Sequence, residues 1–254
     1  MHLLHLGYYK KNTIFQQDEK DHRGKDFLSN VVEKWEKESL EFKKLGIRTT
    51  IFRIGLVLSE KGGVLKKLYP IFKFFLGVPI GNGKQAISWI HIKDLIDMIK
   101  ECMIKKEYSG VYNAVAPNVI TNEKFTHELS NVLNRPSYPK FLKAPSFIIK
   151  LLFGELSSLV LNGLNISSKK IQTVGFKYSY ESVSSALKNI YSKNFKYNDL
   201  KLYSNEIFEL IKFSNKKISK SKRRNLKVSE DTTVVICYGD SVFDNSKLNS
   251  IRSF

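Results

Sequence analysis

The sequence contains only two cysteines in 254 residues, Cys102 and Cys237, and they lie far apart along the chain. Two separated cysteines build neither a disulfide framework nor a structural metal site, and such sparing use fits a reducing compartment. Long apolar segments are also lacking: charged residues and a glycine interrupt the longest one, 147–164, so we expect no membrane span. The first six residues are too short for a secretory signal. The default expectation is a soluble, cytoplasmic protein.

Acidic residues are scarce: 24 Asp and Glu stand against 42 Lys and Arg, which gives a net charge of +18. A balance of this kind is compatible with nucleic acid or an anionic membrane as partner. The lysines, however, are spread along the chain together with many asparagines, and no nucleic-acid-binding module is present. We therefore expect no specific nucleic-acid partner. The sequence gives no oligomeric state.

A glycine-rich phosphate loop is missing as well. Neither Gly-x-x-Gly-x-x-Gly nor Gly-x-Gly-x-x-Gly follows any predicted strand. Such a loop, with the helix N-terminus after it, binds the pyrophosphate of a dinucleotide. We therefore expect no pyrophosphate site within these residues.

The most informative stretch that is present runs from Gly81 to Leu95. It combines a glycine turn, a short extended run around Trp89 and a helix that Asp94 is placed to cap. Its order, Gly-x-Gly-x-Gln-x-x-Ser-Trp-Ile-His-Ile-x-Asp-Leu, resembles an epimerase-like subfamily of the extended short-chain dehydrogenase/reductases, which ends in an uncharacterised C-terminal domain. The resemblance covers residues 7–191.

This resemblance implies an α/β fold: a partial doubly wound (Rossmann-like) parallel sheet with a small C-terminal α/β domain. We expect a partial NAD(P)-binding domain at 1–135, the subfamily's C-terminal domain at 136–191 and a disordered basic tail at 192–254. The implied activity is that of an NAD(P)-dependent epimerase or reductase acting on a nucleotide sugar or related small molecule. The family's phosphate loop would lie before Met1, so we expect an N-terminally truncated, inactive chain that binds NAD(P) weakly or not at all. Plant relatives in the subfamily imply a plastid-type organelle as an alternative compartment.

Catalytic residues are poorly represented. The family's serine falls at Leu4, and the helix expected at 26–45 carries Trp35 and Glu36 in place of the Tyr-x-x-x-Lys pair. Tyr8 and Tyr9 remain as candidate catalytic groups, although both residues are also common in packing. For Trp35 and Glu36 the alternative is a packed aromatic residue beside a solvated carboxylate. An apolar stripe of the same helix is predicted at Leu28, Val31, Val32, Trp35 and Phe42.

Binding candidates come from two other segments. In the strand predicted at 47–58, Arg53 and Gly55 resemble the family's cofactor-contacting residues, but an ion pair with a helix carboxylate is an equal interpretation for Arg53. The candidate substrate-binding residues are Gly83, Gln85, Ser88, Trp89 and His91. The lysines of the helix expected at 64–75 can meet a phosphate or form a solvated face. No metal site is predicted.

The last segment contains a strand at 233–238 that runs into Gly239-Asp240-Ser241, which resembles the first block of GDS-type esterases. A nucleophilic serine needs a histidine base, and none follows it in this chain. We therefore interpret the motif as a chance match or a truncated fusion. The alternative to an enzyme-like function is a non-catalytic binding or interaction remnant of the fold.

Overall fold

The computed structural model describes residues 5–11, 15–60, 62–136, 144, 163–192 and, for the backbone alone, 233–238. In chain order the elements are η1 (His5–Tyr8), α1 (Phe27–Lys44), β1 (Arg48–Ile54), β2 (Leu56–Leu58), α2 (Gly63–Lys73), β3 (Ala86–Ile87), β4 (Trp89–His91), α3 (Ile92–Ile104), β5 (Gly110–Ala114), β6 (Ile120–Thr121), α4 (Asn122–Val132), α7 (Lys169–Thr173), α8 (Val183–Tyr191) and β7 (Thr233–Tyr238).

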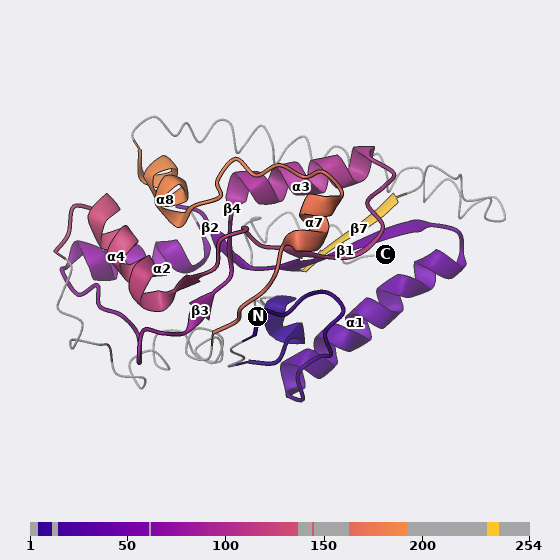
Figure 1. The fold of residues 1–254 in the computed structure, drawn as a ribbon, viewed down its shortest axis with the longest axis horizontal. Helices are drawn as coiled ribbons and strands as arrows, with labels where there is room; N and C mark the ends of the chain where they lie inside the picture. The colour runs from indigo at the N-terminus through magenta and orange to yellow at the C-terminus, as the bar shows by residue number, and fades with distance from the viewer. Residues whose placement is uncertain are drawn as a thin grey trace, which may run out of the picture.

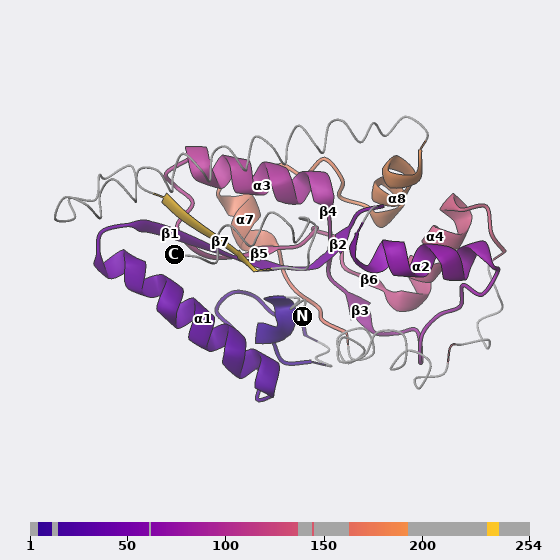
Figure 2. The same cartoon turned by 180° about the vertical axis from the view of Figure 1, so that it is seen from behind.

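A parallel sheet lies at the centre, with the strand order β5-β1-β7. Helix α3 covers one face of this sheet and α1 covers the opposite face (Figures 1 and 2). Side chains alternate along a strand: Phe52 belongs to the core under α3, whereas Arg53 pairs with α1. The expected α/β fold with a parallel, Rossmann-like sheet is confirmed.

The strand predicted at 47–58 is divided at Gly55. Before the glycine, β1 pairs with β5; after it, β2 pairs with β4. A Cβ at position 55 would lie 2.8 Å from the Ser88 carbonyl oxygen and 2.8 Å from Val115 Cγ1. Glycine is needed here because three chain segments meet where the strand changes partner.

Helix α1 has the predicted limits but a different buried face. Asp26 caps it by accepting a hydrogen bond from the Ser29 amide, and Gly46, with φ of +73°, follows its end. The buried positions are Ser29, Val32, Glu36 and Ser39. Of the predicted stripe of Leu28, Val31, Val32, Trp35 and Phe42, Val32 is buried and Leu28 packs against the core cluster of Leu6 and Tyr9, whereas Phe42 is exposed.

Small residues explain this choice of face. The hydroxyls of Ser29 and Ser39 donate to carbonyl oxygens of their own helix, those of Asp26 and Trp35, so their burial leaves no hydroxyl unbonded. Their small size lets the helix approach the sheet closely enough for Glu36 to reach Arg53.

Two further predictions need correction. The apolar residues within 1–6 predict a strand, but Leu6 lies in the 3₁₀ turn η1. The N-cap of α3 is His91, whose Nδ1 accepts from the Lys93 amide, and not Asp94. The Asp94 carboxylate instead accepts from the amides of Ser179 and Tyr180 at 2.8 and 3.1 Å, which ties α3 to the segment before α8.

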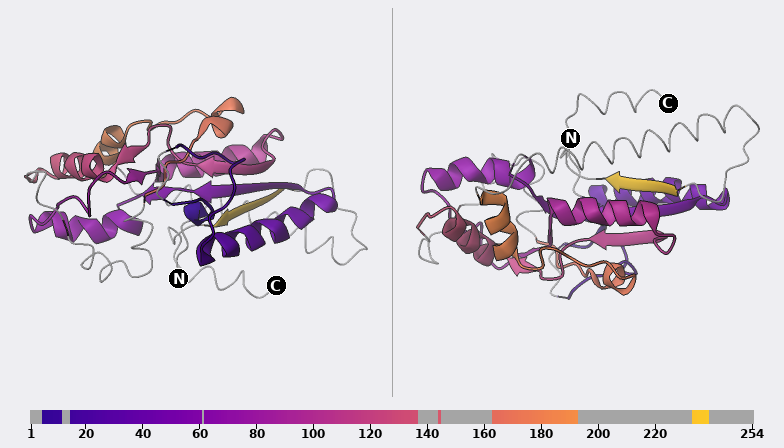
Figure 3. Two further views of the ribbon diagram at one scale, coloured as in Figure 1. Left: turned by 60° about the horizontal axis from the view of Figure 1, so that its bottom comes forward. Right: turned by 90° about the horizontal axis from the view of Figure 1, so that it is seen from above.

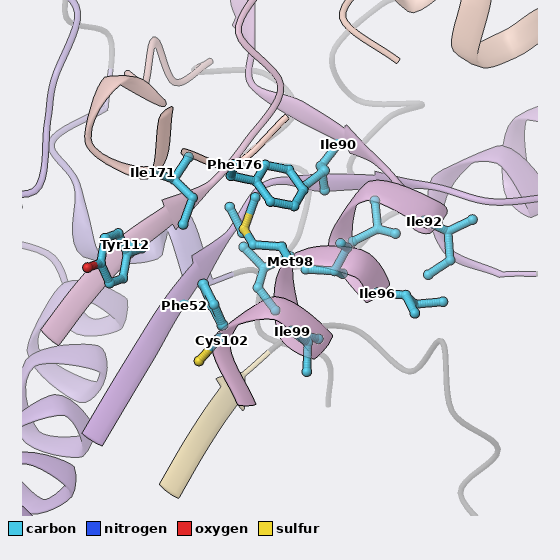
Figure 4. Close-up of a cluster of buried hydrophobic side chains, with 14 of the residues drawn as sticks. Phe52, Ile90, Ile92, Ile96, Met98, Ile99, Cys102, Tyr112, Ile171 and Phe176 are labelled. Atoms are coloured by element: carbon cyan, nitrogen blue, oxygen red, sulfur yellow. The ribbon is translucent and has the colours of Figure 1, made fainter. Parts of the chain in front are cut away.

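The segment 163–192 completes the two main cores. Ile171 and Phe176 join the cluster between α3 and the sheet (Figure 4). Helix α8 packs against α4 and β2, and its residues Val183, Leu187 and Ile190 belong to the second cluster. Figure 3 shows α2, α4 and α8 gathered at the end of the molecule away from α1. The apolar spacing of residues 147–156 also predicts a core-facing helix, and this segment lies outside the described residues, as do the lysine-rich clusters at 216–224. Strand β7 falls within the span for which the sequence predicts disorder.

Candidate functional site

The carboxyl ends of β1 and β5 bring together the polar residues of the candidate site. Arg53 on β1 and Asn113 on β5 are register partners near the ends of two parallel strands. Turn η1 packs against β1 and α1 and delivers Tyr8 and Tyr9 to the same place. In open α/β sheets, ligands bind beyond the carboxyl ends of the strands.

Arg53 is the centre of this group and is 2% exposed. Its Nε and Nη2 donate to the two carboxylate oxygens of Glu36, each at 2.8 Å, and its Nη1 donates to the Tyr9 hydroxyl at 2.8 Å. Burial alone would lower the pKa of Arg53, but the hydrogen bonds and charges of Glu36 and Tyr9 outweigh it and raise that pKa. The structure thus contains the ion pair with a helix carboxylate that the sequence left as an alternative. The interpretation of Glu36 as a solvated carboxylate is wrong, because that residue is 6% exposed.

Tyr9 is fully buried and held on both sides. Its hydroxyl donates to Asn113 Oδ1 at 2.7 Å and accepts from Arg53. Burial raises the pKa of Tyr9, so the phenol keeps its proton at neutral pH. Tyr9 is therefore placed to anchor the group.

Tyr8 differs from its neighbour. Its ring is half-buried and lies over the Arg53 guanidinium, with 3.4 Å between the guanidinium carbon and the ring centroid. It meets Tyr9 edge to face, with the ring centroids 5.3 Å apart. Among the described residues its hydroxyl has no hydrogen-bond partner. Of the two predicted catalytic tyrosines, Tyr8 has the hydroxyl that is left for an external oxygen.

Two residues of this region were not foreseen from the sequence. Glu19 Oε1 accepts from the backbone amide of Asn113 at 2.7 Å, and Lys170 Nζ donates to the Val111 carbonyl at 2.6 Å. Both bonds are made on the side of β5 that faces away from β1. Burial raises the pKa of Glu19. No sequence pattern announces these contacts, because they join loops and helices about 60 to 90 residues away from β5.

The five predicted substrate-binding residues lie in one segment and make internal contacts. Ser88 donates to the Leu164 carbonyl and accepts from the Ile166 amide, and Trp89 Nε1 donates to the Asn118 carbonyl. Gln85 Nε2 donates to the Ile80 carbonyl, and the Gly83 carbonyl accepts from the Glu123 amide. These contacts hold the segment against α4 and against residues 164–166. A substrate role for these residues stays a prediction.

His91 is fully buried and caps α3. Its ring lies 4.0 Å from the Tyr180 ring, centroid to centroid. Burial, assisted by the nearby charge of Lys93, lowers the pKa of His91 to about 3. A neutral imidazole at every physiological pH serves here as a cap and a packing group.

The N-terminus of α2 is a further polar feature. The helix begins at Gly63, just after the parallel strand β2, and its N-cap Gly62 supplies no side-chain hydrogen bond to the first turn. Lys66 and Lys67 on its first two turns are exposed. Open amides at a helix N-terminus are suited to phosphate oxygens.

Cofactor binding can be tested against these residues. A dinucleotide site of this fold needs a strand, a glycine-rich loop and a helix N-terminus in direct succession. Residues 5–11 and 15–60 form η1, α1, β1 and β2, and this part of the chain contains no such succession. The turn from β2 to α2 contains the adjacent glycines Gly62 and Gly63 but neither Gly-x-x-Gly-x-x-Gly nor Gly-x-Gly-x-x-Gly, so the described residues do not provide the loop that holds the pyrophosphate of NAD(P). Within the same described ranges, no group of three or more His, Cys, Asp or Glu is arranged to hold a metal ion. None of the described helices has the length and hydropathy that a membrane span requires.

The parallel sheet and its flanking helices define an α/β protein with a Rossmann-like fold, similar to that of Rossmann-fold epimerases. The UDP-glucose 4-epimerase of Thermus thermophilus, solved with NAD, shares this fold: its TM-score is 0.54 at 11% identity, covering 74% of this chain and 61% of that one.

Sequence comparison identifies proteins of this fold that are more similar to the chain. Residues 144–190 match the family described as "Domain of unknown function (DUF1731)". The chloroplastic SDR39U1 homologue of Arabidopsis thaliana, an epimerase family protein, is 37% identical over 185 residues, which are 73% of this chain and 52% of the relative. The human epimerase family protein SDR39U1, solved with NADPH, superposes with a TM-score of 0.64 at 29% identity, over 73% of this chain and 62% of the human one.

The chain thus has a DUF1731 domain, and its homologues over about three quarters of its length are SDR39U1-like epimerase family proteins. The structures solved with NADPH and NAD support NAD(P) as the cofactor of the family. The chain spans about half the length of the Arabidopsis relative, 52%.

Proposed function

We propose that this chain forms the substrate side of an epimerase-type site for a nucleotide sugar. The observation that carries the proposal is the arrangement at the carboxyl ends of β1 and β5, where a buried Arg53–Glu36–Tyr9 group supports the half-buried ring of Tyr8. The name of the Thermus relative, a UDP-glucose 4-epimerase, supports the substrate class.

In this proposal Tyr8 contacts the substrate and the buried group positions it. The Tyr8 hydroxyl donates a hydrogen bond to a sugar oxygen and is the group from which a proton can be moved. Arg53 holds the ring by stacking on its face, and Tyr9 fixes the backbone next to it. Arg53 and Gly55 act in support, because the Arg53 donors and the space beside Gly55 are already occupied by protein atoms.

The diphosphate of the substrate is assigned to the N-terminus of α2. Gly62 leaves the first-turn amides without a side-chain cap, and the exposed Lys66 and Lys67 add positive charge at the same end of the helix. The described residues provide no pyrophosphate site for NAD(P), so we derive no hydride step from them. We expect weak or no NADPH binding by the 254-residue chain.

The test is calorimetric titration of the 254-residue protein with UDP-glucose. We expect measurable binding that the substitution Tyr8→Phe weakens about tenfold, the equivalent of one lost hydrogen bond of roughly 1.4 kcal/mol. Tyr108→Phe is the matched control, because it removes a phenol hydroxyl that donates to Glu101 at the amino end of β5, away from both Tyr8 and the N-terminus of α2, and should leave the affinity unchanged. Equal affinities for the wild type and Tyr8→Phe would remove Tyr8 from the site.

A non-catalytic binding or interaction remnant is the second candidate. It is favoured by the internal bonding of Tyr9, Arg53 and Ser88, whose polar atoms are all directed to protein partners. A folded protein that binds neither UDP-glucose nor NADPH would support this alternative over the first.

For the cellular compartment we propose a plastid-type organelle in place of the cytoplasm, supported by the chloroplastic name of the Arabidopsis relative. Fractionation of cells with an antibody raised against the chain tests this. Recovery of the protein with the cytosolic fraction would contradict it.

A further inference from the structure

The turn that ends helix α2 exposes a run of large apolar side chains. Phe74, Phe75 and Leu76 are 71%, 50% and 66% exposed, and Tyr69, one turn before the helix ends, is 43% exposed. Single apolar side chains are ordinary on a protein surface, whereas several in one short stretch mark a site of contact with a partner. We call these four residues the apolar tip of α2. Helix α2 lies at the end of the molecule away from α1 (Figures 1 and 2).

Phe75 occupies a backbone position that suits glycine better. Its φ of +62° lies in the left-handed region, where a residue with a Cβ is strained. The Leu76 amide donates to the Ile71 carbonyl at 3.0 Å, and the Phe75 amide donates to the Phe72 carbonyl at 3.0 Å. These two bonds form the Schellman ending of a helix, in which the left-handed residue is usually glycine. A half-exposed phenylalanine at this strained position points to a role outside the packing of the fold.

The surroundings of the apolar tip are basic. Between Glu60 and Asp94 the sequence has six lysines and no acidic residue. One of these lysines, Lys73, is exposed at the end of α2, next to the apolar tip. Arg135 follows the end of α4, and its guanidinium carbon lies 4.9 Å from the centre of the Phe75 ring. Apolar side chains flanked by cations fit a surface that is apolar inside and negatively charged outside.

We propose that the apolar tip of α2 docks the protein on a membrane surface that contains anionic lipids. Phe74 and Leu76 enter the boundary between headgroups and acyl chains, while Lys73 and Arg135 stay at the level of the lipid phosphates. A contact of this kind is peripheral and needs no spanning helix. It is independent of the proposed function, because it uses the carboxyl end of α2, whereas the diphosphate of a substrate is assigned to the amino end of that helix.

The size of the apolar tip favours a lipid surface over a protein partner. A stable protein interface buries about 800 Å² on each side and draws on roughly 20 to 30 residues, far more than the four side chains of the apolar tip. A bilayer needs no complementary hollow, and a few inserted apolar side chains with adjacent cations are enough for reversible binding.

The test is sedimentation of the 254-residue protein with vesicles of phosphatidylcholine alone and with vesicles that also contain phosphatidylserine. We expect binding to the second kind of vesicle only, and weaker binding as NaCl is raised from about 0.1 M to about 0.5 M, because salt screens the charges. The variant Phe74→Ser/Leu76→Ser keeps every charge of the chain and should bind about tenfold more weakly. Lys73→Gln should bind about fivefold more weakly.

The matched control is the variant Leu45→Ser/Ile104→Ser. It removes two side chains that are 62% and 77% exposed at the ends of α1 and α3, so the affinity for vesicles should stay unchanged. Phe75→Gly separates docking from folding. It relieves the left-handed strain, so it should weaken vesicle binding without lowering the Tm. A phenylalanine with a structural role alone would instead lower the Tm and leave the binding unchanged.

Three results would each overturn the proposal: no binding of the wild type to vesicles that contain phosphatidylserine, equal binding to both kinds of vesicle, or equal affinities of Phe74→Ser/Leu76→Ser and the control variant. A dimer in analytical ultracentrifugation that Phe74→Ser/Leu76→Ser dissociates, without vesicle binding by the wild type, would also overturn it and assign the apolar tip to a second copy of the chain.

Discussion

At the scale of residues, the buried ion pair of Arg53 and Glu36 joins β1, near its carboxyl end, to α1. Both side chains are nearly inaccessible, at 3% and 8% side-chain exposure, and two hydrogen bonds join them. Removing one partner of a buried pair leaves the other charge uncompensated, which typically costs about 3–5 kcal/mol. The net contribution of the intact pair to stability is much smaller, since both charges lose their hydration when the pair forms.

We therefore predict that Glu36→Gln lowers the free energy of unfolding by about 3 kcal/mol, measured by urea denaturation. The surface ion pair of Glu41 with Lys44 supplies the control, and Glu41→Gln should change the stability by well under about 1 kcal/mol. The double variant Glu36→Leu/Arg53→Met should recover most of the loss. Equal effects of Glu36→Gln and Glu41→Gln would show that the buried pair is energetically unimportant.

Substitution of Tyr191 should raise the free energy of unfolding, in contrast to the loss expected for Glu36→Gln. Its hydroxyl is buried and has no hydrogen-bond partner among the described residues, and burial raises the pKa of this phenol. A buried donor without a partner costs about 1–3 kcal/mol. Tyr191→Phe should therefore raise the free energy of unfolding by roughly 1 kcal/mol while keeping the stacked contact with Tyr69. A loss of stability would mean that the hydroxyl has a favourable interaction.

Titration of His91 should make the stability of the protein depend on pH. Its pKa falls from 6.5 to about 3 on folding, so between these values the unfolded chain binds a proton that the folded chain does not. The contribution of His91 is thus fully present above pH 6.5 and is lost as the pH falls toward 3, by up to about 1.4 kcal/mol per pH unit. His91→Asn keeps a capping side chain and removes the titration, so its stability curve should be flatter over this window. Parallel curves for both proteins would contradict the assignment.

At the scale of elements, the sheet has two very different edges. On β5, Glu19 and Lys170 occupy the outward amide of Asn113 and the outward carbonyl of Val111. Side chains that cover an edge prevent further strands from pairing there. On the other side, β1 accepts β7 over six register pairs, so the sheet extends in that direction only.

The change of strand partner between β1 and β2 depends on Gly55, so a substitution at this position tests its importance. Gly55→Ala would place a methyl group 2.8 Å from the Ser88 carbonyl oxygen, closer than backbone atoms tolerate. We expect a loss of roughly 2 kcal/mol in the free energy of unfolding. Faster hydrogen exchange at the Leu56 amide, which donates to Ser88, should accompany it. Unchanged exchange at this amide would show that the junction adapts without cost.

The sequence predicted the positions of helices and strands better than it predicted which face of a helix is buried. The limits of α1 and the presence of a strand after Gly46 follow from local signals, and so does the helix after His91. The buried face of α1 did not follow, because it is set by the position of Arg53 on a neighbouring strand and by serines small enough for close approach. Glu19 was invisible for the same reason: its partner is a backbone amide 94 residues away. Contacts between distant segments decide such features, and local periodicity carries no information about them.

At the scale of the whole molecule, the described residues form one side of a parallel sheet with a polar group at its carboxyl edge. The sequence foresaw this arrangement through its resemblance to the epimerase-like family, and the comparisons confirm the family and the fold. In the proposed function, the chain contributes the strand-end tyrosines and the N-terminus of α2 to a site. What its described residues do not contribute is a glycine loop for a dinucleotide.

We infer that the described residues provide the substrate side of a site without a pyrophosphate site for a dinucleotide. Titration of the 254-residue protein with NADPH, followed by the fluorescence of the nicotinamide, tests it most directly. We expect no saturation in the micromolar range, under conditions in which UDP-glucose binds. A micromolar dissociation constant for NADPH would contradict it.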